Sequence, residues 1–456
     1  MNKKTTNYTE FLKAKKLKSI ESGFDCSDYK YPRLTKEFQW DIVKWACKRG
    51  KAAIFADTGL GKTLMQLIWA DLVSKHTGKP VLLLAPLCVS HQTVREADKF
   101  GIVAEYDRHG VSDCMIVVTN YEMLKNFKPD NFAGIVLDES SILKGLNGSV
   151  RKSITEFAAS IHYRLSCTAT PSPNDFMELG TQSEFLGIMS QTEMLATYFV
   201  HDSENTSKWR LKGHGRTVFW EWLSTWSVVV RDPSDLGYES GDYDLPELKM
   251  IEHVVETEPT EDLFASIALG LQDRNKARKE SVIYRCEIAA DLLNSWDIGI
   301  AWCNLNAESD LVAKLASITN IQGSDSTEKK ESDILGFTTG DIKKITTKPK
   351  IAGFGLNWQH CNKMVFVGLS DSFESFYQAV RRCWRFGQTE QVEVHIVISD
   401  REGAVLDNIK RKQRQHDQMA EEMQNVMQDL TIAQIKGATL EKATYEPSQP
   451  IQIMGI

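Results

Sequence analysis

The chain has 456 residues, of which 42% are hydrophobic and 25% charged, and its net charge is -7 at pH 7. This composition is ordinary for a globular protein and excludes extensive disorder, and the length suffices for two or three domains. An acidic net charge does not exclude nucleic-acid binding, because a local basic groove is enough to hold a phosphate backbone.

Apolar runs of membrane-spanning length and a signal-peptide core are both missing from the sequence, so we expect no membrane association. The nine cysteines are scattered and never form a C-x-x-C pair, which predicts a reducing cytoplasm without a disulfide framework or a structural zinc. Residues 1–30 begin with a lysine-rich stretch that we expect to be a basic arm, either solvated or facing nucleic acid.

The stretch ADTGLGKT, residues 56–63, lies between an apolar strand at 52–55 and a helical pattern at 64–73. Glycines in such a turn let backbone N–H groups point at phosphate oxygens, and the start of the following helix adds partial positive charge. Lys62 is expected to meet the β- and γ-phosphates of a nucleotide, and the Thr63 hydroxyl to hold Mg²⁺. The alternative is a plain glycine turn. The predicted nucleotide-binding residues are Asp57, Thr58, Gly59, Leu60, Gly61, Lys62 and Thr63.

Ahead of this loop, the segment from Tyr31 predicts a helix with an apolar stripe. Gln39 lies at the edge of that stripe, and its amide could both donate to and accept from an adenine edge, although a lone glutamine is more often a surface residue. The stripe consists of Phe38, Ile42, Val43, Trp45 and Ala46.

Apolar runs then alternate with helical patterns, which predicts a parallel sheet with helices on both faces. Ligands of such sheets gather at the carboxyl ends of the strands. Pro86, Thr119 and Asn120 follow two of the runs and are candidates for contacting a bound polymer, unless they are simple turn residues. The runs are 81–85, 115–118 and 135–137, and a further strand is expected at 163–167.

Asp138 and Glu139 end the third run. Two adjacent carboxylates beside a buried strand are costly to ionise unless a cation is near. Asp138 is expected to hold Mg²⁺ through water, and Glu139 to orient and deprotonate the attacking water. The alternative is a helix cap.

Residues 191–245 interrupt the pattern with tryptophans among basic residues, and a linker closes this part at about 237–246. Lys208, Arg210 and Lys212 are candidates for phosphate contacts. The tryptophans of FWEWLSTW are better explained by an amphipathic helix that packs on the first domain with Trp220 and Trp226 inward.

The second half repeats the alternation after a helical region at 261–294, with strands expected at 298–303, 343–347, 365–369 and 392–398. After the second of these strands, Lys348 and Lys350 could lie beside a phosphate chain, with glycines at 353 and 355 allowing close approach.

Gln378, Arg382 and Arg385 fall on one face of a helix near the end of this half. A helix face that carries arginines beside a cleft favours phosphate binding. The alternative is a surface salt-bridge network with Glu374 or Glu390.

Together these stretches resemble the ordered motifs of superfamily 2 helicases, of the DEAD/DEAH type and in the Swi/Snf-like branch. ADTGLGKT, TNYEML, VLDESS and LSCTATPSPND resemble motifs one, one-b, two and three, while KPKIAGFGLN and QAVRRCWRFGQ resemble motifs five and six. DESSILKG and TATPSPND are most similar to the compact helicases of bacteriophages and prophages. The resemblance extends from about residue 34 to residue 399.

The resemblance implies an α/β fold of two tandem RecA-like domains with an ATP cleft between them. These would be residues 31–190 and 246–415, joined by the insertion at 191–245 and followed by a polar tail at 416–456. It implies that Arg382 and Arg385 act as arginine fingers. The resemblance also implies that Gln378 acts in catalysis and that Gly355 contacts the nucleotide. It implies a coupling role for Ser166, Thr168 and Thr170.

Two departures bear on the function. Arg381 stands where Swi/Snf-like members often have an acid, and motif three reads Thr-Ala-Thr-Pro rather than Gly-Thr-Pro. We also expect no room in the chain for the large accessory domains of chromatin remodellers, and therefore do not expect chromatin remodelling.

We therefore expect an ATP- and Mg²⁺-dependent DNA helicase or translocase that serves phage replication, recombination or repair in the cytoplasm of a bacterial host. A replication or recombination protein is a possible partner. The alternatives are a duplex DNA translocase that does not separate strands, and a non-enzymatic nucleic-acid-binding scaffold on a helicase fold. RNA is a less favoured track.

Overall fold

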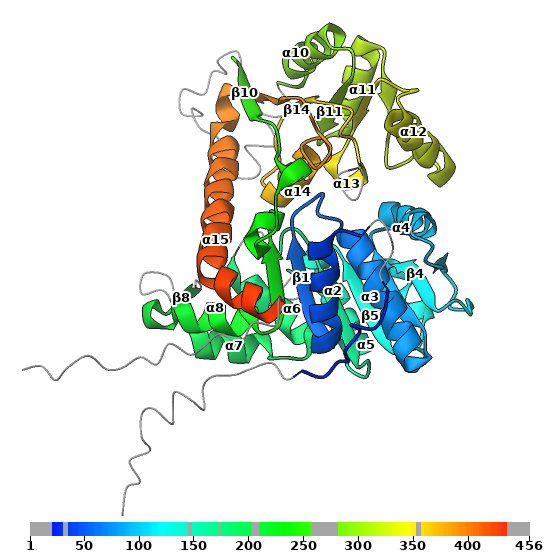
Figure 1. Cartoon of the computed structure of the whole chain (residues 1–456). Helices are drawn as coiled ribbons and strands as arrows, with labels where there is room; N and C mark the ends of the chain where they lie inside the picture. The colour runs from blue at the N-terminus through cyan, green and yellow to red at the C-terminus, as the bar shows by residue number, and fades with distance from the viewer. Residues whose placement is uncertain are drawn as a thin grey trace, which may run out of the picture.

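The structure is a computed structural model that describes residues 21–30, 35–144, 148–172, 175–201, 209–256, 281–352 and 357–435. Lys208, Gly355, most of the basic arm and the end of the polar tail therefore lie outside the described residues. Two α/β domains, each built on a parallel sheet, lie one above the other (Figure 1). This arrangement confirms the predicted fold class of two RecA-like domains.

Every strand pair of the first sheet is parallel. Parallel pairing places the carboxyl ends of all the strands at one edge, where loops can gather functional side chains. In spatial order the strands are β3 (Glu105–Tyr106), β4 (Ile116–Asn120), β2 (Val81–Ala85), β5 (Gly134–Asp138), β6 (Tyr163–Cys167), β1 (Lys51–Ala56) and β9 (Ser227–Val230).

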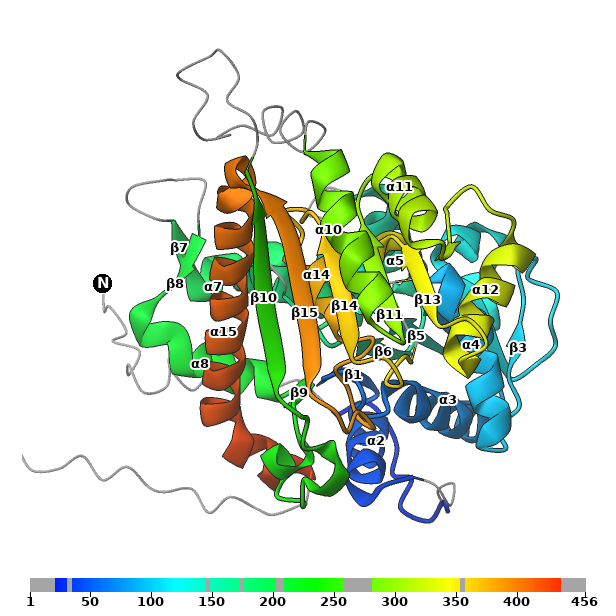
Figure 2. The same ribbon diagram turned by 90° about the horizontal axis from the view of Figure 1, so that it is seen from above.

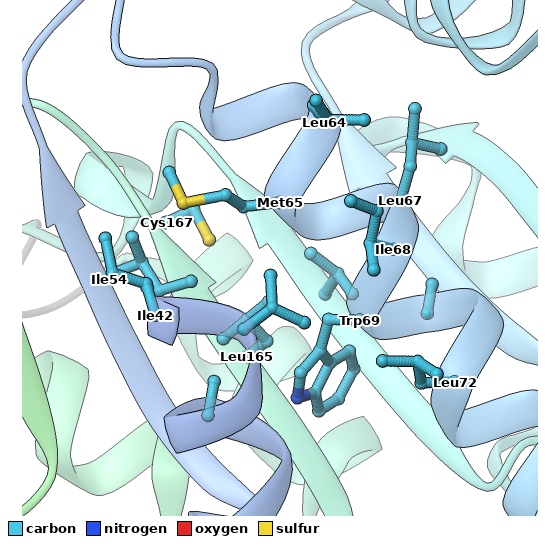
Figure 3. Packing of buried hydrophobic residues seen from close by; sticks show 14 of the residues in the cluster. Ile42, Ile54, Leu64, Met65, Leu67, Ile68, Trp69, Leu72, Leu165 and Cys167 are labelled. Carbon is cyan, nitrogen blue, oxygen red and sulfur yellow. The ribbon is translucent and has the colours of Figure 1, made fainter. Parts of the chain in front are cut away.

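Helices bury both faces of this sheet, which explains why its strands are almost continuously apolar. In Figure 3, Met65 and Trp69 of a covering helix pack toward Ile54 and Leu165 of the strands. One face is covered by α2 (Glu37–Arg49), α3 (Lys62–Thr77) and α4 (Leu87–Lys99), and the other by α5 (Ser149–Ala158), α6 (Leu179–Leu186), α7 (Gln191–Tyr198) and α8 (Arg216–Ser224).

The second sheet is also parallel throughout (Figure 2). Its strands, in spatial order, are β10 (Leu248–Val255), β15 (Val392–Ser399), β14 (Lys363–Val367), β11 (Gly299–Cys303), β13 (Lys344–Thr347) and β12 (Thr319–Asn320). One face is covered by α10 (Val282–Ser295) and α11 (Asn306–Ala316), and the other by α12 (Thr327–Thr339), α13 (Pro349–Ala352) and α14 (Phe373–Val380).

The segment expected to be an insertion contributes to the first domain. Its final strand, β9, forms the edge of the first sheet beside β1, and a short antiparallel hairpin, β7 (Phe199–His201) with β8 (Trp209–Leu211), precedes α8. As predicted, Trp220 and Trp226 point inward and are completely buried, and Trp222 is buried with them. The tryptophans of this helix therefore form part of the core.

Strand β10 is a feature that the sequence analysis missed. Only its last residue is fully buried, because it is the edge strand of the second sheet and pairs with β15 alone. An edge strand lacks the continuous apolar run that identifies a central parallel strand. Strand β10 follows the expected linker at 237–246 directly, so the second sheet begins with β10, ahead of the first strand expected at 298–303.

The last helix, α15 (Gly403–Ile435), continues into the region expected to be a polar tail. Near its start Val405 and Ile409 pack in the core of the second domain, and near its end Met427 packs in the core of the first. The helix therefore spans both domains (Figure 1). Although it is 33 residues long, neither it nor any other helix in the described ranges is apolar enough to cross a membrane.

A histidine pair on β10 and β15 predicts how acid affects the second domain. His253 Nε2 lies 2.8 Å from His395 Nδ1, and burial lowers the pKa of both imidazoles from the usual 6.5. The two imidazoles therefore bind protons more tightly in the unfolded chain than in the native state. The stability that the neutral imidazoles contribute is present above about pH 6.5 and is lost as the pH falls.

We expect His395→Phe to reduce the loss of thermal stability between about pH 7.5 and about pH 5.5, measured by circular dichroism melts. The exposed His109→Phe should leave that loss as in the wild type. A loss of equal size in the His395 variant would contradict the assignment.

Candidate active site

The turn after β1 has the backbone geometry of a phosphate cradle. Gly59 and Gly61 have φ angles of 95° and 81°, a region that favours glycine. A Cβ atom at Gly61 would lie 2.3 Å from Gln39 Nε2, and one at Gly59 would lie 2.9 Å from Phe386 Cβ. Both glycines are therefore needed for conformation and for space.

Helix α3 begins at Lys62 without a side-chain cap on its first turn, so its N-terminal N–H groups are suited to receive an anion. Lys62 Nζ donates to the carbonyl oxygens of Ala56 at 2.8 Å and Asp57 at 3.1 Å, which holds the ammonium over the loop. Burial lowers the pKa of Lys62, although Glu139 opposes this effect. Thr63 lies in the same first turn.

Gln39 is a buried support of this loop and is only 5% exposed, so the surface alternative is wrong. Its Nε2 donates to Leu60 O at 2.9 Å, and its Oε1 accepts from the Lys36 backbone N–H at 3.0 Å. The predicted adenine contact stays a prediction, but the amide has a second role that the sequence did not indicate.

Asp138 is the last residue of β5, at the carboxyl edge of the first sheet, and Glu139 follows it. Asp138 Oδ1 accepts from Gln66 Nε2 at 2.7 Å, and its carbonyl oxygen accepts from the Tyr121 hydroxyl at 2.5 Å. Burial and the neighbouring Glu139 raise the pKa of Asp138 from 3.8 to about 7. A cation would relieve this cost, and the donor set of a carboxylate and the Thr63 hydroxyl fits Mg²⁺, which keeps waters and binds phosphate oxygens.

Glu139 has a φ of 53°, a strained conformation for a residue with a side chain. The Thr168 hydroxyl makes a long contact of 3.5 Å with Glu139 Oε2, and the Thr170 N–H donates to Thr168 Oγ1 at 3.1 Å. The turn after β6 is thus joined to the acidic pair.

Ser166 extends the same network within β6. Its hydroxyl lies within hydrogen-bond distance of Ser140 Oγ, at 2.9 Å, and of Gln182 Oε1, and Gln182 Nε2 donates to Ser140 O at 2.9 Å. All three of the predicted coupling residues therefore connect to residues 139–140.

The second domain reaches the phosphate loop through Arg381. Its Nη2 lies 2.5 Å from Asp57 Oδ2, and its Nε donates to Thr58 Oγ1 at 2.5 Å. The Tyr377 hydroxyl donates to Asp57 Oδ1 at 2.9 Å. Burial would raise the pKa of Asp57, but Arg381 and the Thr58 N–H lower it below its usual value.

Arg382 and Arg385 follow on the same segment. Arg382 is 2% exposed, and its Nε donates to Gln378 O at 3.0 Å. Burial lowers the pKa of Arg385 to about 9, and Arg382 and Arg381 add to the effect. Arg385 also lies close enough to Lys62 to lower the pKa of that lysine. Cations of both domains therefore face one site.

The acids of the alternative salt-bridge network have other partners. Glu374 pairs with Lys144 of the first domain, and Glu390 accepts from Asn362 Nδ2 at 3.0 Å. The first of these pairs is a further contact between the domains.

Of the residues predicted to contact nucleic acid, several are buried or hydrogen-bonded within the protein. Thr119 and Asn120 are 0% and 1% exposed inside β4, and Asn120 Oδ1 accepts from the Met123 N–H, so neither side chain is available to a polymer. Lys212 Nζ donates to carbonyl oxygens at the end of α7. Arg210 is exposed on β8.

The remaining candidates lie beside the space between the domains. Pro86 precedes α4, and its carbonyl oxygen accepts from residues of that helix. Lys348 Nζ donates to Asn306 Oδ1 at 2.5 Å, and Lys350 is exposed on α13, on the side of the second domain that faces the first (Figure 1). Pro86 and Lys350 therefore remain candidates for contacting a polymer.

Sequence reasoning missed several residues that build the site. Gln66 lies one turn beyond Lys62 and Thr63 on α3, and this spacing was a usable signal for a second residue at the site. The sequence carried no such signal for Gln182 or Tyr377. Arg381 was noticed only as a departure from a motif.

Gln378 offers a test of the site's stability. It is 1% exposed, and neither of its amide atoms has a hydrogen-bond partner within the part of the chain that the structure describes. An unpaired buried amide costs ~1–3 kcal/mol, so Gln378→Leu should stabilise the second domain by up to that amount in urea denaturation. The matched change Gln182→Leu removes a bonded amide and should be destabilising. Destabilisation of both variants would show that Gln378 is paired in solution.

Part of the second domain matches a helicase family. Residues 284–387 match the model of the family "Helicase conserved C-terminal domain". The human TATA-binding protein-associated factor 172 is 25% identical over 219 residues, which are 38% of this chain and 12% of that protein. The yeast (Saccharomyces cerevisiae) TATA-binding protein-associated factor MOT1 is 26% identical over 200 residues, which are 36% of this chain and 11% of that protein.

Among solved structures, the Sulfolobus solfataricus SWI2/SNF2 ATPase core in complex with dsDNA aligns with a TM-score of 0.40 and 19% identity, covering 90% of this chain and 98% of that one. The chain spans about an eighth or less of the length of the two curated relatives. Over residues 284–387 the second domain thus matches the helicase C-terminal family, and that segment contains Gln378, Arg382 and Arg385.

Proposed function

We propose that the chain is an ATP-dependent motor that moves on DNA. The observation that carries the proposal is the position of Lys62 and Arg385. These two cations come from different domains, yet Arg385 is close enough to Lys62 to lower the pKa of that lysine, which also interacts with Glu139 and Asp138. Like charges that are buried together favour a polyanionic ligand, and a nucleoside triphosphate with its metal has the required charge.

The chemistry divides between the domains. Lys62 and the first turn of α3 would bind phosphate oxygens, and Glu139 would accept the proton of the attacking water. Arg385 and Arg382 would stabilise the negative charge that develops on the γ-phosphate. Bound Mg²⁺ would neutralise phosphate charge, with Asp138 and Thr63 as its protein ligands.

Movement follows from the location of the site. Because both domains contribute to one phosphate site, binding favours closure of the domains and product release favours opening. Polymer contacts on the two domains, such as those we propose for Pro86 and Lys350, would then shift relative to one another in each cycle. The match to the helicase family supports a nucleic acid as the track.

On the sequence resemblance alone we also propose that the motor separates strands, for which a duplex translocase is the alternative. On the same basis we propose a phage or prophage origin, with action in the bacterial cytoplasm and a replication or recombination protein as partner.

Variants of the phosphate site test the motor chemistry. Lys62→Ala should abolish ATP binding, whereas Glu139→Gln should still bind ATP and lower kcat by roughly a hundredfold or more. Lys75→Ala, on the exposed side of the same helix, is the matched control and should hydrolyse ATP normally. Fluorescent-nucleotide titration and phosphate release measure the two effects. Normal turnover in the Glu139 variant would leave a non-enzymatic scaffold as the better explanation.

The track is tested by steady-state ATPase with single-stranded DNA, blunt duplex, forked DNA and RNA. We expect DNA to raise kcat several-fold and RNA to raise it less. Stimulation that is greatest with forks or single strands would support strand separation, and stimulation that is greatest with blunt duplex would support translocation alone. Hydrolysis that responds to none of these nucleic acids would contradict the proposed track.

A further inference from the structure

Arg381 makes an ion pair across the domain boundary with the phosphate loop itself. Its Nη2 contacts Asp57 Oδ2 at 2.5 Å and Thr58 O at 3.3 Å, and its Nε contacts Thr58 Oγ1 at 2.5 Å. The side chains of Arg381 and Asp57 are 4% and 16% exposed. A buried, charge-assisted pair of this kind has more specific geometry than an exposed one.

Aromatic residues hold Arg381 in this position. The guanidinium carbon lies 4.9 Å from the centre of the Trp384 ring and 5.8 Å from that of Tyr377, distances typical of cation–π contacts. The Tyr377 hydroxyl donates to the same Asp57, and Trp384 Nε1 donates to Pro246 O at 2.7 Å in the linker. The pair is thus fixed from both domains and from the linker.

The segment that follows Arg381 is short and tightly turned. The Arg381 N–H bonds to Tyr377 O, the Trp384 N–H to Val380 O and the Arg385 N–H to Cys383 O. These turns transmit the position of Arg381 to Arg385, since few backbone torsions between them are free. The position of one arginine therefore restricts that of the other.

Phe386 reinforces this restriction on the other side of Arg385. Its ring stacks on Tyr243 of the linker with centroids 4.5 Å apart, and its Cβ lies against Gly59 of the phosphate loop. Residues before and after Arg385 therefore both contact the loop that Lys62 follows.

We propose that Arg381 is a positioning residue, whose pairing with Asp57 and Thr58 sets Arg385 opposite Lys62 when the domains close. The inference rests on the proposed ATPase function. In this arrangement the guanidinium of Arg381 is occupied by the loop, so it acts through Arg385 and not on the phosphate directly. Assembly of the phosphate site and closure of the domains are then the same event.

The test is a set of substitutions measured by steady-state ATPase. Arg381→Gln should lower kcat by roughly a hundredfold, the effect of a displacement of about 1 Å in a reacting group, with much less change in KM for ATP. In an Arg385→Ala background the same change should alter kcat by less than about twofold, because the residue it positions is gone. If the losses of kcat in the two single variants multiply in the double variant, Arg381 contacts the phosphate itself and the inference is overturned.

A second double variant, Arg381→Gln with Asp57→Asn, distinguishes a positioning role of Arg381 from a merely structural one. Arg381→Gln alone leaves Asp57 buried without its partner and should lower the melting temperature. Combining it with Asp57→Asn removes both charges and should recover much of that stability while kcat stays low. Recovery of kcat together with stability would overturn the positioning role.

The control for the chemistry of the substitution is Arg216→Gln, which breaks an exposed pair with Glu422 and should change neither kcat nor the melting temperature.

The same variants separate an error in the positioning role from an error in the proposed function. If Lys62→Ala and Glu139→Gln abolish turnover but Arg381→Gln does not, only the positioning role is wrong. If Lys62→Ala and Glu139→Gln hydrolyse ATP normally, the ATPase site itself is wrong.

Discussion

The burial of several cations at one boundary is the constraint on which the rest of the structure depends. Lys62, Arg381 and Arg385 come from two domains and lose most of their hydration where the domains meet. Such a grouping is unfavourable unless anions compensate it. Asp57 compensates Arg381 within the protein, and Lys62 interacts with Glu139 and Asp138, a carboxylate pair that is itself costly to ionise.

Parallel sheets explain how such a site can be built. In the first domain, Ala56 and Asp138 both stand at the carboxyl ends of central strands, so the phosphate loop and the acidic pair meet without a specific long-range design. The supporting hydrogen bonds then come from neighbouring elements, as Gln66 shows on α3 and Ser166 on β6. The position of Glu139 at a positive φ indicates that this environment is rigid enough to hold a strained residue.

Much of this architecture could be predicted from sequence, and the exceptions have physical causes. The strand at 81–85 was located because central parallel strands are continuous apolar runs between turn residues. Edge strand β10 lacks such a run. The phosphate loop and the acidic pair have local patterns, but the partner of Arg381 lies 324 residues away and carries no local signal. Thr119 and Asn120 are buried because β4 extends through them, two residues beyond the apolar run at 115–118.

Helix α15 limits how the two domains can move. At ~1.5 Å per residue its 33 residues have a contour length of about 50 Å. The helix bends toward its C-terminal end (Figure 1), and its two ends are anchored in different hydrophobic cores. Gln434, near its end, accepts hydrogen bonds from Trp45 and Arg49 of α2, the helix that also carries Gln39. Complete separation of the domains would expose the apolar contacts of Met427. The helix therefore works as a tether of fixed length, so that the domains can pivot about it but cannot drift apart between one chemical cycle and the next.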